Sequence, residues 1–142
     1  MIACLESYGI TKGEIEFEVT ESTIITNLDE CAGFADKIKE KGLHLSIDDF
    51  GTGYSSLSRL IDLPVSKLKI DRSLIRNINN RADALAIVRG VVNIAHDLNL
   101  LVVAEGVENS KQADLLAEIK CDLLQGFGIG MPRGIDDALI AA

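Results

Sequence analysis

Hydrophobic and polar residues alternate along this chain with two different periods, and each change of period indicates the end of one element. Residues 14–21 (EIEFEVTE) alternate strictly, with Phe17 and its apolar neighbours on one face and acidic residues on the other, which is typical of a half-buried strand. Residues 28–42 place apolar side chains at helical spacing and close with Gly42, a residue that commonly follows the end of a helix. The pattern therefore predicts a strand followed by a helix.

The strand–helix alternation continues through the rest of the chain. Further strands are predicted at 43–49, 65–71, 100–106 and 121–126, and further helices at 54–61, 82–99, 109–120 and from 135 onward. Strands that alternate with helices form parallel βαβ units. The pattern predicts an α/β fold with about five parallel strands, and by itself it suits an open flavodoxin-like sandwich as well as part of a barrel.

Length and charge narrow the classes of function. A chain of 142 residues is long enough for one domain with its own core. Its net charge of −8 argues against nucleic acid as a partner, because nucleic-acid binders carry a basic face. No apolar run approaches the ~20 residues of a membrane span, and the widely spaced cysteines indicate reduced thiols rather than a disulfide framework. We expect a cytoplasmic protein with no membrane segment in this chain.

Polar residues gather at the predicted carboxyl ends of all five strands. They are Glu18, Asp48, Asp49, Asp71, Glu105 and Gln125, and Lys69 lies two residues before Asp71. Ligands and chemistry collect at this edge of parallel α/β folds. Carboxylates at one edge repel one another unless a proton or a cation lies between them, and Mg²⁺ and Mn²⁺ prefer carboxylate oxygens. The sequence therefore predicts a divalent metal site at the carboxyl edge of the sheet.

Five segments, in order along the chain, carry a resemblance to a known family. The segments EVTE, DDFGTGYSSL, KIDRSLI, VVAEGVE and QGFGIGMP resemble motifs of the EAL domain of bacterial cyclic di-GMP signalling. The resemblance implies a TIM-type (β/α)8 barrel that hydrolyses cyclic di-GMP to linear pGpG with Mg²⁺ or Mn²⁺ in a two-metal site. It also implies that consecutive strands are neighbours, which favours a partial barrel over the flavodoxin-like sandwich.

The same resemblance implies a role for each matching residue. The implied metal ligands are Glu18, Asp48, Asp49, Asp71 and Glu105. The implied catalytic residues are Lys69, which contacts the attacking water, Glu105, which acts as a general base, and Gln125, which lines the catalytic centre. The implied glycine-rich loop and its supports are Gly51, Gly53, Glu21 and Glu108.

Simpler interpretations remain open for some of these residues. A cap of the following helix is an alternative role for Glu108, and a turn in which the side chain bonds its own backbone is an alternative for Asp49. Glu16 is expected to be solvated or structural rather than a ligand. His44 and His96 lack the spacing of metal ligands and are expected to be bystanders.

Parts of the family pattern have no counterpart here. A full (β/α)8 barrel takes about 250 residues, and neither the Glu-Ala-Leu segment nor the strand with the metal-binding asparagine is found in this sequence. We therefore expect residues 1–142 to be a truncated EAL domain whose exposed sheet edges drive self-association into a dimer or larger assembly. Three interpretations fit: hydrolysis of cyclic di-GMP, an inactive module that binds the nucleotide or a protein partner, or a folded fragment with no activity.

The adjacent acids also predict an effect on stability. Asp48 and Asp49 are expected to repel each other and their acidic neighbours when no metal is bound. Asp48→Asn is therefore expected to weaken metal binding and to raise the stability of the metal-free protein.

Overall fold

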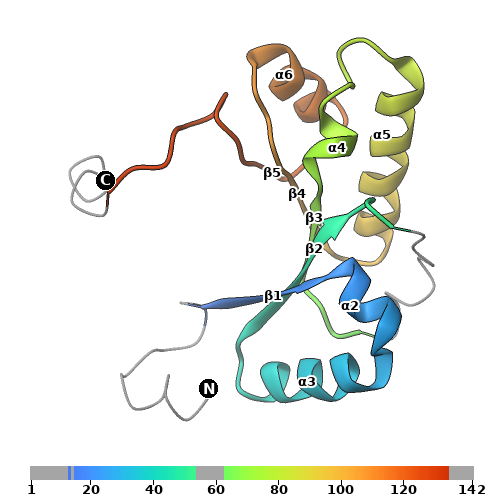
Figure 1. Ribbon diagram of the computed structural model, residues 1–142, viewed down its shortest axis with the longest axis vertical. Coiled ribbons are helices and arrows are strands. Elements are labelled where there is room, and N and C mark those ends of the chain that lie inside the picture. The colour runs from blue at the N-terminus through green and yellow to red at the C-terminus, as the bar shows by residue number, and fades with distance from the viewer. Residues whose placement is uncertain (1–12, 14, 54–62, 135–142) are drawn as a thin grey trace.

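Five parallel strands form the centre of the molecule. The computed structural model describes residues 13, 15–53 and 63–134 (Figure 1). The strands are β1 (Glu16–Thr20), β2 (His44–Phe50), β3 (Lys67–Ile70), β4 (Leu101–Ala104) and β5 (Leu123–Leu124). The helices are α2 (Glu21–Thr26), α3 (Leu28–Glu40), α4 (Arg72–Ile75), α5 (Ala82–Asp97) and α6 (Ser110–Glu118). The α/β class predicted from the sequence is confirmed.

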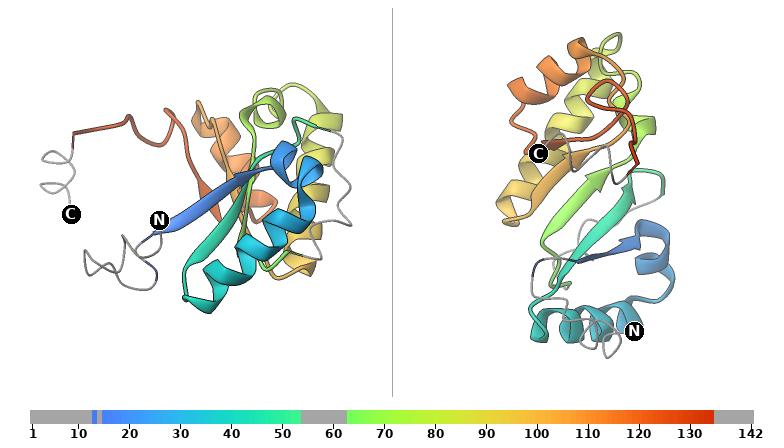
Figure 2. Two further views of the ribbon diagram at one scale, coloured as in Figure 1. Left: turned by 60° about the horizontal axis from the view of Figure 1, so that its bottom comes forward. Right: turned by 90° about the vertical axis from the view of Figure 1, so that its left-hand side faces the viewer.

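The strands follow one another across the sheet in chain order, β1-β2-β3-β4-β5, and every pairing is parallel. The helices of the described residues lie on one side of the sheet, and none of them covers the other side (Figure 1 and Figure 2). A flavodoxin-like sandwich has helices on both faces, whereas a barrel keeps its helices outside a ring of strands. The chain therefore forms part of a barrel, as the resemblance implied.

The core lies between the sheet and the helices. Ile47, Leu68 and Val102 point from three neighbouring strands into this layer and are almost completely buried. On β1, Phe17 meets Phe34 of α3 edge to face, with ring centroids 5.8 Å apart. Along each strand, these residues alternate with side chains that point to the opposite face. One set of side chains therefore forms the core, and the other set lies on the face that carries the candidate site residues.

The open face of the sheet is the side on which Glu18, Ser46, Lys67 and Leu101 lie. These four residues are register partners on one rung, so their side chains point to the same side. Most of the rung is polar, but Leu101 is 49% exposed, and Leu123 on β5 is 46% exposed. The open face therefore combines ionisable residues on β1 to β3 with exposed apolar residues on β4 and β5.

Two short helices, α2 and α4, were not predicted from the sequence. Each begins directly at the end of a strand, where a side chain caps the first turn. The Thr20 hydroxyl accepts a hydrogen bond from the Thr23 backbone N–H at 3.4 Å, and the Asp71 carboxylate accepts one from Ser73 at 2.9 Å. Both preceding strands therefore end one residue earlier than the sequence predicts.

The other helices agree with the prediction, with shifted ends. Helices α3, α5 and α6 lie inside the predicted ranges, while β5 is shorter than the predicted 121–126. The helices expected at 54–61 and from 135 onward lie outside the described residues. Among the helices that the structure describes, α5 is the longest with 16 residues, and none is long and apolar enough to cross a bilayer.

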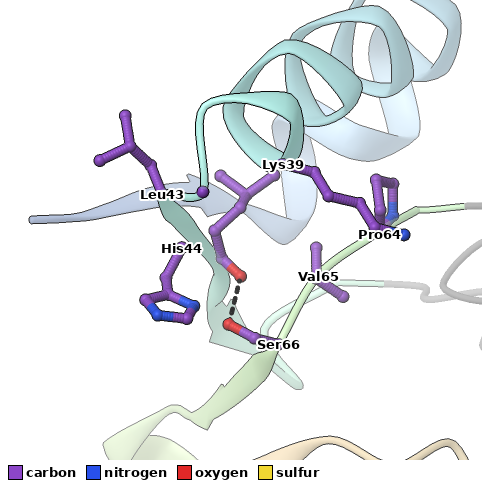
Figure 3. Close-up of a pocket in the computed structure, with 8 residues that line it drawn as sticks. Lys39, Leu43, His44, Pro64, Val65 and Ser66 are labelled. Atoms are coloured by element: carbon purple, nitrogen blue, oxygen red, sulfur yellow. Dashed lines mark hydrogen bonds between the residues drawn. The ribbon is translucent and has the colours of Figure 1, made fainter. Parts of the chain in front are cut away.

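A cavity of about 310 Å³ opens at the amino-terminal edge of the sheet, between the end of α3 and the start of β3 (Figure 3). It is lined by Lys39, Gly42, Leu43, His44, Leu45, Pro64, Val65 and Ser66. The Ser66 hydroxyl donates a hydrogen bond to the Leu45 carbonyl at 3.2 Å. The lining of this cavity contains no carboxylate. The acidic residues that were predicted to form the site lie toward the other ends of the strands.

Candidate functional site

Three carboxylates from neighbouring strands contact one ammonium group. Lys69 Nζ on β3 lies 2.7 Å from Glu18 Oε1, 3.0 Å from Asp48 Oδ1 and 2.8 Å from Glu105 Oε1. Glu18 belongs to β1 and Asp48 to β2, while Glu105 directly follows β4. We call these four residues the carboxylate–lysine cluster. The structure thus brings together four residues that the sequence placed on four separate strands.

The cluster holds a positive charge at its centre. Burial works to lower the pKa of Lys69, but the hydrogen bonds that its ammonium donates to Glu105, Glu18 and Asp48 outweigh burial and raise the pKa above its ordinary value. One ammonium faces three carboxylates, so the cluster retains an excess of negative charge. Lys69 is therefore an internal cation among acids that would otherwise repel one another.

Asp49 reaches the carboxyl edge because β2 is irregular there. In a regular strand, Asp48 and Asp49 would point to opposite faces. The register with β3 shifts between Ile47 and Phe50, and Asp49 has φ +56°, a left-handed conformation that Asp tolerates better than most residues. The Asp49 carbonyl accepts hydrogen bonds from the backbone N–H and the hydroxyl of Thr52 at 3.3 and 3.0 Å. Asp49 thus forms a turn and faces the site as well.

A cavity of about 400 Å³ lies at this edge, which we call the carboxyl-edge cavity. It is lined by Asp49, Asp71, Arg72, Glu105, Gly106, Glu108, Gln125, Gly126 and Phe127. Glu105 belongs to both this cavity and the carboxylate–lysine cluster, so the two are continuous. Five of the predicted site residues therefore line one space beside the cluster.

The glycines after β5 fix the position of Gln125. A Cβ atom at Gly126, which has φ +155°, would lie 2.3 Å from the backbone N and O of Val107, and one at Gly128 would lie 2.5 Å from the backbone of Glu108. Only glycine permits this approach. The Val107 N–H donates to the Gln125 carbonyl at 3.0 Å. The segment after β5 is therefore locked onto the segment after β4, and Gln125 is held beside Glu105.

Glu21 and the glycine-rich loop are in direct contact. Glu21 is buried, and its Oε2 accepts a hydrogen bond from the Gly51 backbone N–H at 2.7 Å. Gly51 has φ +102°, a conformation that favours glycine. A Cβ atom at Gly53 would lie 3.0 Å from Glu21 Oε1. This geometry suits the loop-supporting role that the resemblance implied for Glu21, Gly51 and Gly53.

Asp71 lines the cavity and also caps a helix. Burial works to raise the pKa of its carboxyl group, but hydrogen bonds from Ser73 and the nearby charge of Arg72 outweigh burial and lower the pKa. One oxygen, Oδ1, accepts the Ser73 backbone N–H that begins α4. Asp71 is outside the carboxylate–lysine cluster, and its capping bond is a role that the sequence did not indicate.

The side chain that caps α6 is Asn109, the residue directly after Glu108. The Asn109 side chain accepts a hydrogen bond from the Gln112 backbone N–H at 3.1 Å. Gln112, which the sequence reasoning missed, is buried, accepts the Glu108 backbone N–H at 2.8 Å and donates to the Ile75 carbonyl at 3.3 Å. The sequence could have indicated this burial, because Gln112 lies four residues before the apolar Leu116 and therefore on the same face of the helix.

Further pairs of charged or polar side chains lie away from the carboxylate–lysine cluster, and two of them join separate elements. Glu16 Oε2 contacts Lys67 Nζ at 2.6 Å, which confirms a structural role for Glu16. His96 Nε2 lies 2.9 Å from Asp122 Oδ2, which also accepts the Val102 backbone N–H at 2.8 Å. These pairs join elements of the fold.

The chemistry of the cluster fits a divalent metal, although its present arrangement holds an ammonium. Among residues 13, 15–53 and 63–134, no three His, Cys, Asp or Glu side chains are arranged as a metal site. The carboxylates of Glu18, Asp48 and Glu105 nevertheless converge on one positive charge. Hard divalent cations prefer such oxygen ligands. These three residues, with Asp49 and Asp71 on the adjoining cavity, are the ones that would hold a metal.

Comparison with known proteins gives one family and several close relatives. The family model of the EAL domain matches residues 1–132. The chain is 42% identical over 128 residues to the cyclic di-GMP phosphodiesterase NbdA of Pseudomonas aeruginosa, an alignment that covers 90% of this chain and 16% of NbdA. The chain thus spans about a sixth of the length of the first curated relatives that it matches.

Solved structures share the fold. The PaMucR phosphodiesterase in complex with c-di-GMP has a TM-score of 0.91 and 39% identity, covering 96% of this chain and 56% of that one. BlrP1 of Klebsiella pneumoniae, solved with cyclic di-GMP and either manganese or calcium, has a TM-score of 0.82 and 37% identity, covering 89% of this chain and 32% of that one. The partial barrel seen here is therefore part of a TIM-barrel-like domain.

Proposed function

Because the chain belongs to the EAL domain family, we propose that it hydrolyses cyclic di-GMP to linear pGpG with divalent metal ions, Mg²⁺ or Mn²⁺. The observation that carries this proposal is the convergence of Glu18, Asp48 and Glu105 on the single positive charge of Lys69. The relatives named as cyclic di-GMP phosphodiesterases support the choice of substrate.

Five acids would hold the metal ions in this proposal. They are Glu18, Asp48, Asp49, Asp71 and Glu105. Metal ions held by these acids would supply an activated water and would neutralise the charge of the phosphodiester. The backbone of Asp49 is already turned so that its side chain lines the same cavity as Glu105 and Asp71.

Lys69, Glu105 and Gln125 would act on the reacting groups. The Lys69 ammonium, which lies among Glu18, Asp48 and Glu105, donates a hydrogen bond to the attacking water and offsets negative charge on the phosphate. Glu105 accepts the proton that the water loses. Gln125, held by the packing of Gly126 on Val107, positions the nucleotide in the carboxyl-edge cavity.

The remaining residues support this geometry. Glu21 holds the glycine-rich loop through Gly51, and Gly53 permits the close approach of the Glu21 carboxylate. Glu108 lines the cavity beside Glu105. A change at any of these four positions is expected to act on activity through the placement of other groups.

A second candidate is an inactive module that binds cyclic di-GMP or a protein partner. The observation that favours it is that Lys69 Nζ stands within 3.0 Å of all three converging carboxylates. In this alternative, Lys69 remains the permanent counter-ion of the cluster. The retained acids then serve the fold and the nucleotide site without turnover.

Two expectations from the sequence belong to the same proposal. We propose that residues 1–142 act as a truncated EAL domain in the bacterial cytoplasm, without nucleic acid as a partner. We also propose that copies of the chain associate and thereby cover the open face and the edges of the sheet, because unpaired strand edges are ready templates for pairing.

Product analysis separates the two functions. The protein is incubated with cyclic di-GMP and Mn²⁺, Mg²⁺ or neither, and pGpG is measured by chromatography. Metal-dependent pGpG that Asp48→Asn lowers at least about 100-fold supports hydrolysis. Asp114→Asn, the same change at an exposed position of α6, is the control. Nucleotide binding without pGpG under any metal supports the inactive module.

A further inference from the structure

A second cavity, of about 460 Å³, adjoins the carboxyl-edge cavity. It is lined by Arg72, Ser73, Arg76, Gly106 and Glu108, of which Arg72, Gly106 and Glu108 also line the carboxyl-edge cavity. We call it the arginine cavity. The two cavities therefore adjoin one another along Arg72, Gly106 and Glu108.

The sign of the charge changes from one cavity to the next. The carboxyl-edge cavity has four carboxylates, from Asp49, Asp71, Glu105 and Glu108, and one guanidinium, from Arg72. The arginine cavity has two guanidinium groups and only the Glu108 carboxylate. In a chain with a net charge of −8, this is a local excess of positive charge beside an acidic site.

Arg72 is held against the turn that carries Glu105. Gly106 has φ +67°, and a Cβ atom there would lie 2.4 Å from Arg72 Cβ and 3.3 Å from its Cα. Glycine therefore lets α4 pack directly on the turn after β4. Arg76 follows Arg72 by one helical turn, a spacing that places both side chains on the same face.

Both guanidinium groups are available to a ligand. Within the part of the chain that the structure describes, no carboxylate lies within ion-pair distance of Arg72 or Arg76, in contrast to Lys67, Lys69 and Arg81. Both arginine residues are exposed. Arginine presents a fork of N–H donors that matches a phosphate group, and it stays charged at any working pH.

We propose that Arg72 and Arg76 form an anion subsite for the phosphodiester of cyclic di-GMP that is not cleaved. This inference rests on the proposed function. Cyclic di-GMP has two phosphodiester groups, each with one negative charge, and only one of them can lie at the reacting centre. The other needs a cation of its own, and Arg72 and Arg76 supply it in the adjoining cavity.

The test measures binding and turnover separately on the 142-residue protein. Isothermal titration of cyclic di-GMP in the presence of Ca²⁺ compares the wild type with Arg72→Ala, Arg76→Ala and Arg72→Lys. Arg89→Ala, which removes the same charge at an exposed position of α5, is the matched control. Circular dichroism verifies that each variant is folded, and each titration is repeated at high salt.

Arg72→Ala is expected to weaken cyclic di-GMP binding at least about tenfold, because it removes a charge-assisted contact with phosphate. Arg76→Ala is expected to weaken it less, and Arg72→Lys to restore part of the loss. The affinity of the wild type should fall with salt more steeply than that of Arg72→Ala, which a merely structural role would not produce.

Three outcomes overturn the subsite. The first is that Arg72→Ala and Arg89→Ala bind cyclic di-GMP with equal affinity. The second is that the wild type does not bind cyclic di-GMP. The third is that inorganic phosphate binds as tightly as cyclic di-GMP, which would indicate a general anion site. Failure of the proposed hydrolysis looks different. The wild type then binds cyclic di-GMP and loses affinity with Arg72→Ala, but forms no pGpG.

Discussion

The ammonium group of Lys69 reduces the electrostatic repulsion among the acidic residues at the carboxyl edge. Three carboxylates lie within 3.0 Å of it, and Lys69 is buried. Removing one partner from a buried ion pair leaves the other charges uncompensated. Lys69→Met should therefore lower the free energy of unfolding by about 2 kcal/mol in the absence of metal, a reduced figure because Glu18 is partly exposed.

Urea unfolding with and without Mn²⁺ tests this prediction. Lys67→Met is the matched control, because Lys67 pairs with a single carboxylate, that of Glu16, among the residues that the structure describes. We expect Mn²⁺ to recover most of the loss in Lys69→Met and little of the loss in Lys67→Met, since a metal replaces the missing positive charge only at the cluster. Equal losses in both variants, with no response to Mn²⁺, would show that Lys69 has no special role.

The structure changes the expectation for Asp48→Asn. From the sequence alone, removing one of two adjacent acids should raise the stability of the metal-free protein. In the structure, Asp48 contacts Lys69, so the substitution relieves repulsion and loses an ion pair at the same time. We now expect the free energy of unfolding to change by less than about 1 kcal/mol. A larger change in either direction, measured by urea unfolding without metal, would contradict this balance.

At the scale of elements, the contact between the segments that follow β4 and β5 places Gln125. In Gly126→Ala, the new Cβ atom would meet the Val107 backbone at 2.3 Å, and a backbone cannot move aside as a flexible side chain can. We expect a loss of about 2 kcal/mol in the free energy of unfolding, comparable with other strained or overpacked positions. Weaker nucleotide binding should accompany it.

Gly130→Ala is the control for this substitution, because a Cβ atom at Gly130 meets nothing within 4 Å. Chemical denaturation measures the stability of both variants, and calorimetric titration of cyclic di-GMP measures binding. If Gly126→Ala were as stable as Gly130→Ala, the packing of the two segments would not be what positions Gln125.

Asp122 joins the end of α5 to β4 and makes stability depend on pH. Burial works to raise its pKa, but hydrogen bonds from His96 and the Val102 N–H outweigh burial and lower the pKa. A carboxyl group whose pKa is lower in the folded state adds stability above its unfolded pKa of about 3.9 and loses it as the pH falls through the folded value.

Asp122→Asn should therefore cost about 1 kcal/mol near pH 6, a modest value because the pair is partly exposed. The difference from the wild type should shrink as the pH falls below about 4. Urea unfolding at a series of acidic pH values measures both proteins, with Asp114→Asn as the exposed control. A difference that stays constant down to the lowest pH would rule out this linkage.

The sequence predicted the strands and the long helices because their periods are set by burial on one face. It also predicted the parallel sheet and the acids at its carboxyl edge, since strand ends can be read from the pattern. The central position of Lys69 was not predictable in the same way, because it depends on side chains from β1, β2 and β4 meeting in space. The conformation of Asp49 and the buried contacts of Gln112 are equally non-local.

At the scale of the whole molecule, the open face of the sheet is a large surface that no described helix covers (Figure 2). Leu101 and Leu123 are about half exposed there. Exposed apolar residues on a sheet face lose contact with water when a second surface covers them. We therefore expect the protein to form dimers or larger assemblies at micromolar concentration, with these two leucines at the interface.

Sedimentation velocity over a range of concentrations tests this expectation. Leu101→Glu should weaken association at least about tenfold, because a carboxylate at the centre of an apolar contact pays a desolvation cost. Ile87→Glu is the matched control, because Ile87 is 55% exposed on α5, on the helical side of the sheet. A monomeric wild type, or equal weakening by both substitutions, would mean that the open face does not hold copies of the chain together.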